Sequence, residues 1–271
     1  MQGLDTNDLD ERMTNPVSIL PEIDQLGTPF GWRQGTGDWA GVDAEIARGE
    51  SVQVIQEAGS TQWQSTLPAQ HPFQFGFPEF TAEVREERPT PKARVWISPI
   101  QRRFADSTDL PKVQWHPRVL WIGIGCERGT PEIVIAHAIQ QALRSHHLAE
   151  AAIAGLATID HKADEAGLMN YCHDLSLPLK CFSAAELRAI AVPNPSTHVH
   201  SKAGTPSVAE AAAILATSGC LTSSAPSRPS PLASRLIVPK QIFRLTDRPG
   251  AVTIAIAQAE QEYTDQVLPM T

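Results

Sequence analysis

The chain has 271 residues, of which 42% are hydrophobic and 19% charged. This is a globular mixture long enough for two domains, since one domain usually takes about 100–200 residues. The formal net charge of -8 argues against a broad basic surface for nucleic acid, so local cations must hold any anionic ligand. The polar, acidic N-terminus has no apolar signal segment, and no apolar run approaches the roughly 18 residues of a membrane span. We therefore expect a cytoplasmic protein that binds neither nucleic acid nor membrane.

The first part of the chain shows few regular patterns. It is expected to hold a disordered leader at residues 1–16 and a smaller irregular α+β region at 17–92. A connecting strand with a linker is expected at 93–116. Within the irregular region, which is rich in aromatic residues, glycine and proline, a helix is predicted near 39–48 and a strand at 51–56. The charged, proline-containing segment 83–92 predicts a linker because it has little to bury. A short strand is expected at 93–98.

From residue 117 onward, strands alternate with helices, which is the pattern of a sheet covered on both faces. Strands are predicted at 119–124, 152–159, 178–182, 235–238 and 252–257. Helices are predicted to begin near residues 130, 164, 183 and 205. Thr130 can cap the first helix with Pro131 in its first turn, and Ser183 with Glu186 forms a capping box. Residues 117–260 are therefore expected to form a three-layer α/β domain with a mostly parallel or mixed sheet, followed by a tail at 261–271.

Two clusters of small, polar and charged residues come where predicted strands end. The first runs from Gly123 to Thr130, and the second from Ala157 to Leu168. In an open α/β sheet, ligands bind in the crevice beyond the carboxyl ends of the strands. Because one helix-length segment separates the two strands, we expect both loops to face the same crevice. The functional site is predicted there.

Asp160, Lys162 and Glu165 are the candidate catalytic residues. Together with Asp164 they place three carboxylates around one ammonium, an arrangement that can shift a pKa toward the values that acid–base work needs. We expect Asp160 or Glu165 to be the base, and Lys162 to be the acid or an electrostatic stabiliser. The alternative is a solvated loop leading into a helix, in which Asp164 or Glu165 only satisfies the helix dipole.

The glycines of the first loop have two interpretations. Gly123-x-Gly125-x-x-x-Gly129 lies between a strand and a helix, as in dinucleotide-binding sites, where Asp160 would hold a ribose. This interpretation makes a nucleotide-dependent oxidoreductase the third functional hypothesis. The spacing differs from that fingerprint, however, and the charged side chains in the turn fit a bulkier anion better. A tight strand-to-helix turn explains the glycines but not Arg128.

The remaining candidate residues are expected to bind substrate. Arg128 is the predicted carboxylate clamp, and hydroxyls at helix starts offer further anion-binding groups. Cys126, beside Arg128 at a helix start, could have a lowered pKa, and the simpler interpretation is a small turn residue. The predicted substrate-binding residues are Cys126, Arg128, Thr130, Asn194, Ser196, Lys202 and Ser207. No metal site is predicted, because the paired histidines have no cysteine or carboxylate at ligand spacing. The four cysteines form no C-x-x-C pair and are expected to be reduced.

Four motifs together resemble one family. The segments Gly123–Thr130, Ala157–Leu168, Pro193–Ser196 and Gly204–Ala211 resemble, in this order, the C-terminal domain of the CbiG-type cobalamin biosynthesis proteins. That domain also resembles CobE, a stand-alone protein of the aerobic cobalamin pathway. The upstream segments Phe30–Arg33, Gly37–Trp39 and Val52–Gly59 resemble the middle region of the same family.

The resemblance implies a cobalt-precorrin-5A hydrolase, which opens the ring-A lactone of a ring-contracted corrin precursor and releases a two-carbon fragment as acetaldehyde. No cofactor is implied, since cobalt enters only as part of the substrate. The acetate and propionate groups of such a substrate suit Arg128, Lys162 and Lys202. Family members usually begin with a further α/β domain, and some carry a fused precorrin methyltransferase, so both are expected as partners. The alternative is a non-catalytic tetrapyrrole-binding or carrier module.

Overall fold

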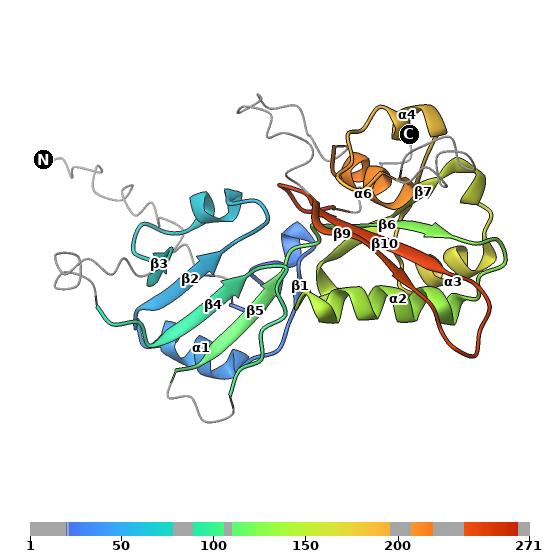
Figure 1. The fold of residues 1–271 in the computed structure, drawn as a ribbon. Coiled ribbons are helices and arrows are strands. Elements are labelled where there is room, and N and C mark those ends of the chain that lie inside the picture. The colour runs from blue at the N-terminus through green and yellow to red at the C-terminus, as the bar shows by residue number, and fades with distance from the viewer. Residues whose placement is uncertain are drawn as a thin grey trace, which may run out of the picture.

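The computed structural model describes residues 20, 22–77, 89–105, 110–195, 207–218 and 236–264. Two five-stranded mixed sheets follow one another along the chain (Figure 1). The predicted leader at 1–16, and most of the linker at 83–92 and of the tail at 261–271, lie outside the described residues. In the part of the chain that is described, no helix is long and apolar enough to cross a membrane.

The first sheet has the strand order β1-β5-β4-β2-β3. Its strands are β1 (Arg33–Gln34), β2 (Val52–Gln56), β3 (Phe73–Phe75), β4 (Ala93–Ile97) and β5 (Lys112–His116). The last four pair in parallel, and β1 adds an antiparallel edge. Helix α1 (Trp39–Ala47) packs against β2, β4 and β5. Its N-terminus is capped by the Asp38 carboxylate, which accepts a hydrogen bond from Gly41 N at 2.9 Å.

The two faces of the first sheet differ in character, as β4 illustrates. Ala93, Val95 and Ile97 are buried in one apolar cluster with Val42 of α1. Arg94 and Trp96 are half-buried and point to the other side, because successive side chains of a strand alternate. The sheet therefore has an apolar face packed on α1 and an opposite face, which we call the polar face.

The upstream region holds more regular structure than its sequence suggests. From the sequence, residues 93–116 are expected to connect two domains. In the structure β4 and β5 form the middle of the first sheet, which corrects that expectation. The short strand expected at 93–98 is β4, but its central place in the sheet depends on pairing with β2, far upstream in the chain, and pairing between distant segments leaves no local pattern. β5 was missed although its polar residues Lys112, Gln114 and His116 alternate with apolar ones, which is a local strand signal.

The second sheet has the order β8-β7-β6-β10-β9. Its strands are β6 (Leu120–Cys126), β7 (Ile153–Ile159), β8 (Leu179–Phe182), β9 (Leu236–Phe243) and β10 (Val252–Gln258). β6, β7 and β8 are parallel, whereas β10 runs antiparallel to both β6 and β9. All five predicted strands are present, and the predicted pairing of 119–124 with 152–159 in one sheet is confirmed.

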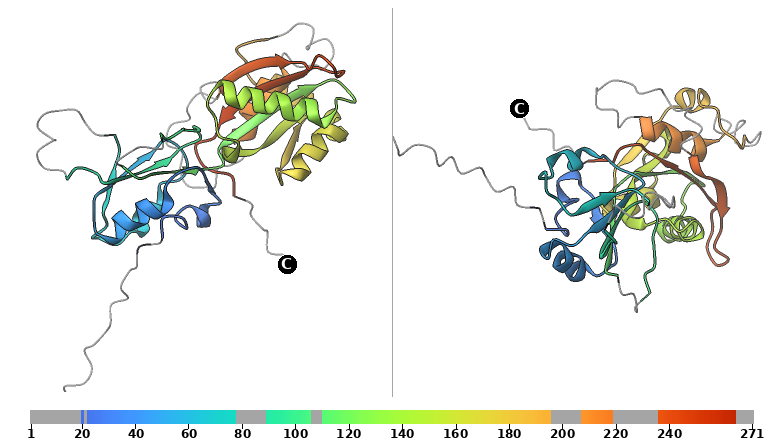
Figure 2. Two further views of the ribbon diagram at one scale, coloured as in Figure 1. Left: turned by 90° about the horizontal axis from the view of Figure 1, so that it is seen from below. Right: turned by 90° about the vertical axis from the view of Figure 1, so that its left-hand side faces the viewer.

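Helices cover both faces of the second sheet, so the predicted three-layer α/β arrangement is confirmed (Figures 1 and 2). Helices α2 (Glu132–Ser145) and α3 (Ala166–Asp174) cover one face, and α4 (Ala184–Arg188) and α6 (Val208–Ser218) cover the other. The predicted capping box of α4 is formed by Ser183 and Glu186. The predicted cap of α2 is wrong: Pro131 occupies the cap position, and Thr130 Oγ1 donates instead to the Glu127 carbonyl at 2.7 Å.

The two domains meet where β4 ends and β7 begins. Ile100 pairs with Leu148 in an isolated β-bridge, and Gln101 N donates to His147 O at 2.7 Å. In a second contact between the two domains, Ser60 N donates to Glu262 Oε2 at 2.6 Å. The carboxyl ends of the first sheet's parallel strands therefore face the second domain. The carboxyl ends of β6, β7 and β8 lie at the opposite end of their sheet, away from this junction.

Candidate functional site

The loops that follow β6 and β7 lie against each other. Because β6 and β7 are parallel neighbours, their carboxyl ends share one edge of the second sheet. Arg128 Nη2, from the first loop, donates to His161 O of the second at 3.0 Å. At the base of the same loops, Gly129 N donates to the Glu165 carboxylate at 2.5 Å. The structure thus brings the two predicted polar clusters together.

Glu165 is the buried centre of this contact. It is 4% exposed, and its two carboxylate oxygens are divided between Gly129 N and Lys162 Nζ, the latter at 3.3 Å. Although Glu165 occupies the cap position of α3, its side chain makes no capping hydrogen bond. Lys162 is committed to this carboxylate. The arrangement therefore holds the two loops together, and neither side chain is freely presented to solvent.

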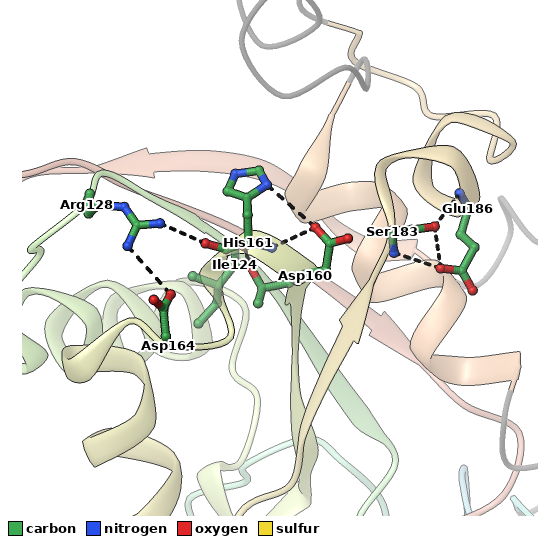
Figure 3. A network of polar contacts seen from close by, with 8 residues as sticks. Ile124, Arg128, Asp160, His161, Asp164, Ser183 and Glu186 are labelled. Atoms are coloured by element: carbon green, nitrogen blue, oxygen red, sulfur yellow. Dashed lines mark hydrogen bonds and ion pairs between the residues drawn. The ribbon is translucent and has the colours of Figure 1, made fainter.

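Asp160 and Arg128 are the accessible members of the cluster. Their side chains are 59% and 65% exposed, and they approach His161 from opposite sides (Figure 3). Asp160 Oδ1 accepts a hydrogen bond from His161 N at 2.7 Å and lies 3.7 Å from His161 Nδ1. Arg128 Nη1 lies 3.6 Å from Asp164 Oδ1. The exposed edge of the cluster thus offers a carboxylate, an imidazole and a guanidinium.

His161 is the residue that sequence reasoning missed. It lies between Asp160 and Lys162, two predicted catalytic residues, and its ring is half exposed beside Asp160. An imidazole ring has two nitrogens, one of which can accept a proton while the other donates one, which suits it to carry protons in catalysis. Its place in a loop directly after a buried strand was a signal that the sequence already contained.

Cys126, at the end of β6, does not have the lowered pKa that its neighbours could produce. Burial raises the pKa of its thiol, and the charge of Glu165 raises it further. The positive charges of Lys162 and Arg128 lower it, but by less. Of the two interpretations of Cys126, the lowered pKa is therefore wrong, because desolvation penalises the thiolate more than the cations stabilise it. Cys126 remains a neutral, half-buried residue at the site.

We expect Cys126 to react slowly with iodoacetamide at pH 7, because only the thiolate is nucleophilic and the raised pKa keeps the thiol protonated. The rate should rise as the pH is increased toward and beyond the usual thiol pKa. Mass spectrometry of the peptide that contains Cys126, with glutathione in the same tube as the reference thiol, measures the rate. Alkylation at pH 7 as fast as that of glutathione would contradict the assignment.

The glycines of the first loop serve packing and turn geometry. A Cβ at Gly123 would lie 1.8 Å from Ala209 O, so this glycine lets α6 pack directly on β6. Gly129 has a φ of +78°, which a side chain would strain, and its surroundings are open. Gly123 therefore faces the backbone of α6, which leaves no room there for a pyrophosphate. The geometry supports the tight-turn interpretation over the dinucleotide fingerprint.

A second polar group lies at the start of α6. Glu210 is fully buried, and its carboxylate accepts hydrogen bonds from Asn194 Nδ2 at 2.8 Å and from Lys240 N at 3.1 Å. Ser207, 2% exposed, caps α6 weakly through Glu210 N at 3.4 Å. The hydrogen bonds of Asn194 thus go to Glu210, a residue outside the predicted set.

The other predicted binding residues vary in accessibility. Thr130 is 2% exposed, and its hydroxyl donates a hydrogen bond to the Glu127 carbonyl. Ser196 and Lys202 lie outside the described residues. Among the residues that the structure describes, no group of three or more histidine, cysteine, aspartate and glutamate side chains is placed to hold a metal ion.

Comparison with known proteins identifies two matching family regions. The family model described as Cobalamin biosynthesis central region matches residues 21–117. The one described as Cobalamin synthesis G C-terminus matches residues 120–257, about half of the chain. The boundary between the two matches falls between β5 and β6, where the first sheet ends and the second begins.

Two curated relatives are similar in sequence. Cobalt-precorrin-5A hydrolase of Priestia megaterium is 27% identical over 195 residues, which cover 71% of this chain and 51% of that protein. Protein CobE of a Sinorhizobium species is 32% identical over 98 residues, which cover 35% of this chain and 64% of that protein. The chain thus spans about half the length of the hydrolase.

Two solved structures are similar over parts of their length. CobE, a protein from the cobalamin (vitamin B12) biosynthetic pathway, superimposes with a TM-score of 0.41 and 29% identity, covering 52% of this chain and 89% of that one. A cobalamin biosynthesis protein G homolog from Sulfolobus solfataricus gives a TM-score of 0.38 and 16% identity, covering 88% of this chain and 60% of that one.

Proposed function

Because the chain belongs to the cobalamin synthesis G (CbiG) family of cobalamin biosynthesis proteins, we propose that it takes part in the hydrolysis of cobalt-precorrin-5A. The reaction consumes one water. Water adds to the carbonyl of the ring-A lactone and the lactone C–O bond breaks. The freed hydroxyl then loses its proton as the carbon–carbon bond to the macrocycle breaks, which releases acetaldehyde, and the macrocycle carbon takes the electron pair and a proton.

Asp160 and His161 are the proposed proton carriers. The observation that carries the proposal is that an exposed carboxylate and an imidazole lie within 3.7 Å of each other at the carboxyl edge of the second sheet. A base must reach the proton that it removes, and these two groups are accessible. Glu165, which the sequence also offers as base, is buried and holds Gly129 N and Lys162. In this proposal Lys162 acts only through its positive charge.

Arg128 is the proposed clamp for a substrate carboxylate. Its guanidinium is exposed: Nη2 donates to His161 O, and Nη1 lies 3.6 Å from the exposed Asp164 carboxylate, a weak surface ion pair that a substrate carboxylate can replace. A guanidinium can form two parallel hydrogen bonds to a carboxylate. The proposed substrate carries several acetate and propionate groups, so one such contact beside Asp160 would orient the lactone. Cobalt would arrive within the substrate, and we propose no resident cofactor.

The experiment that tests the proposal is to incubate the full chain with cobalt-precorrin-5A and to measure acetaldehyde. We expect Asp160→Asn to lower kcat by about 10²–10⁴-fold, the usual contribution of general acid–base catalysis. The matched control is Asp174→Asn, at the exposed end of α3, where the aspartate pairs with the exposed His173. Equal activity of wild type and Asp160→Asn, with the fold intact, would remove Asp160 from the mechanism.

Arg128→Gln is expected to act mainly on substrate binding. Losing a charge-assisted hydrogen bond costs about 1.5–3 kcal/mol, so KM should rise roughly tenfold or more while kcat changes less. Steady-state acetaldehyde release over a range of substrate concentrations separates the two constants. A fall in kcat at unchanged KM would instead place Arg128 in the chemical step.

A second candidate function is a non-catalytic module that binds or carries the tetrapyrrole. It is favoured by the ion pair of Glu165 with Lys162, which leaves neither of these two candidate catalytic groups free. The chain spans about half the length of the hydrolase that it resembles, and we propose that the assay also be run with the further α/β domain with which family members usually begin. Corrinoid binding without acetaldehyde release, even when that domain is added, would favour the carrier function over the hydrolase.

A further inference from the structure

The polar face of the first sheet carries two neighbouring cations. Arg94 on β4 and Lys112 on β5 are partners in the sheet register, so their side chains project from the same face. Arg94 Nε donates to Gln53 Oε1 at 2.7 Å, a neutral amide. Neither cation is within ion-pair distance of a carboxylate among the residues that the structure describes. The pair therefore has positive charge that the described protein leaves uncompensated.

Trp96 links Arg94 to a third cation. The guanidinium carbon of Arg94 lies 6.0 Å from the centroid of the Trp96 ring, and that of Arg102 lies 3.8 Å from it. Arg102 Nη2 donates to Glu57 Oε2 at 2.7 Å, but its Nη1 is enclosed and has no acceptor in the described part of the chain. We call Arg94, Trp96, Arg102 and Lys112 the basic strip. Among the residues that the structure describes, Glu57 is the one carboxylate that pairs with any of its three cations, and it pairs with Arg102.

The basic strip is costly for the protein without a ligand. Like charges on directly opposed strand positions are destabilising, and burial lowers the pKa of Arg94, which shows that its charged form is poorly solvated. The chain carries a net charge of -8, so carboxylates are plentiful elsewhere. An anion bound at the strip would offset this cost and satisfy the unused donors.

The apolar neighbours of the strip indicate the shape of its ligand. Phe77 is 60% exposed and meets the Trp96 ring edge to face at 6.1 Å between centroids. An exposed aromatic ring beside guanidinium groups suits a flat apolar molecule with carboxylates at its rim, because the ring contacts the flat part and the guanidinium groups bind the carboxylates.

We propose that the basic strip is a binding site for a carboxylate-bearing corrinoid, separate from the candidate site at the carboxyl edge of the second sheet. The identity of the ligand rests on the proposed function. The strip belongs to the first domain, to which neither the sequence motifs nor the candidate catalytic residues assign any binding. It would hold the acetate and propionate groups of the macrocycle through Arg94, Arg102 and Lys112.

The test is a titration of the full chain with cobyrinic acid, a corrin that carries seven carboxyl groups. Binding is measured from the change in corrin absorbance. We expect the double variant R94Q/K112Q to bind at least about tenfold more weakly, since each charge-assisted hydrogen bond contributes more than a neutral one. Affinity should also fall with added salt. The matched control is Arg48→Gln, at the C-cap of α1 on the opposite face of the same sheet, where the arginine is exposed and paired with Glu45; the affinity of this variant should be unchanged.

The single variant Lys112→Gln controls for a folding defect, because the Lys112 side chain makes no hydrogen bond among the described residues that the substitution could remove. This variant should also bind cobyrinic acid more weakly than wild type. Unchanged affinity in both variants, or equally tight binding of the uncharged heptamethyl ester of cobyrinic acid, would overturn the proposal.

Acetaldehyde release by R94Q/K112Q is measured in parallel. If release persists while corrin affinity is unchanged, the strip is refuted and the proposed hydrolysis stands. If binding depends on the strip but wild type releases no acetaldehyde, the strip stands and the hydrolysis fails.

Discussion

Replacing Glu165 with alanine is expected to destabilise the second domain by about 3–5 kcal/mol, the usual cost of removing one partner from a buried ion pair. The substitution would leave Gly129 N without its acceptor and the largely enclosed Lys162 ammonium without its counter-charge. Both losses fall at the contact that joins the loops after β6 and β7. Chemical denaturation followed by circular dichroism measures the change.

Asp164→Ala is the matched control for Glu165→Ala, since it removes the neighbouring carboxylate. Asp164 is 75% exposed and lies 3.6 Å from Arg128, so this change should cost less than about 1 kcal/mol. Glu165→Gln should fall between the two, because an amide oxygen can still accept from Gly129 N. Equal stability of the Glu165→Ala and Asp164→Ala variants would show that Glu165 is not the structural centre of the site.

Replacing Gly123 with alanine is expected to displace α6 from the second sheet. The added Cβ would lie 1.8 Å from Ala209 O and 2.8 Å from Ala213 N, and backbone atoms cannot rotate away as a side chain can. Overpacking of a core usually costs about 1–3 kcal/mol, and we expect this contact to exceed that range. A large fall in the thermal midpoint and in soluble yield would be the result.

Gly125→Ala is the matched control, two residues further along the same strand. Its Cβ would lie 3.8 Å from Thr253 and 4.0 Å from Val208, which are ordinary contacts, so stability should change little. If both variants kept the wild-type thermal midpoint, the close approach of α6 to β6 would be refuted. This pair of variants also separates the glycine that packing requires from one that is present without such a need.

The elements of the second domain were predictable because their signals are local. β6 and β7 are runs of apolar residues buried along their whole length but for the end of β6, and the capping box of α4 lies within four consecutive residues. The first sheet was only partly predictable. The strand expected at 93–98 is β4, but the place of β4 and β5 in the middle of the sheet depends on strand partners that are far apart in the chain.

The location of the candidate site could be predicted from the sequence, but the roles of its individual residues could be predicted less well. The order of strands and helices placed Asp160, Glu165 and Arg128 at neighbouring strand ends, because parallel strands that are adjacent in the sheet end at the same edge. The sequence could not tell the buried Glu165 from the exposed Asp160, since the two residues lie five positions apart in one polar loop. Their difference depends on whether Gly129 N is within reach.

The three-layer α/β architecture of the second domain, the position of its polar loops and the family of the chain can all be predicted from local sequence. These follow from apolar periodicity, capping residues and motifs that occupy short stretches of chain. The fold was needed to see that Gly123 serves the packing of α6, that Glu165 joins two loops, that burial raises the pKa of Cys126, and that Arg94 and Lys112 are neighbours. Each of these depends on contact between segments distant in sequence, where desolvation and close packing, rather than residue type, determine what a side chain can do.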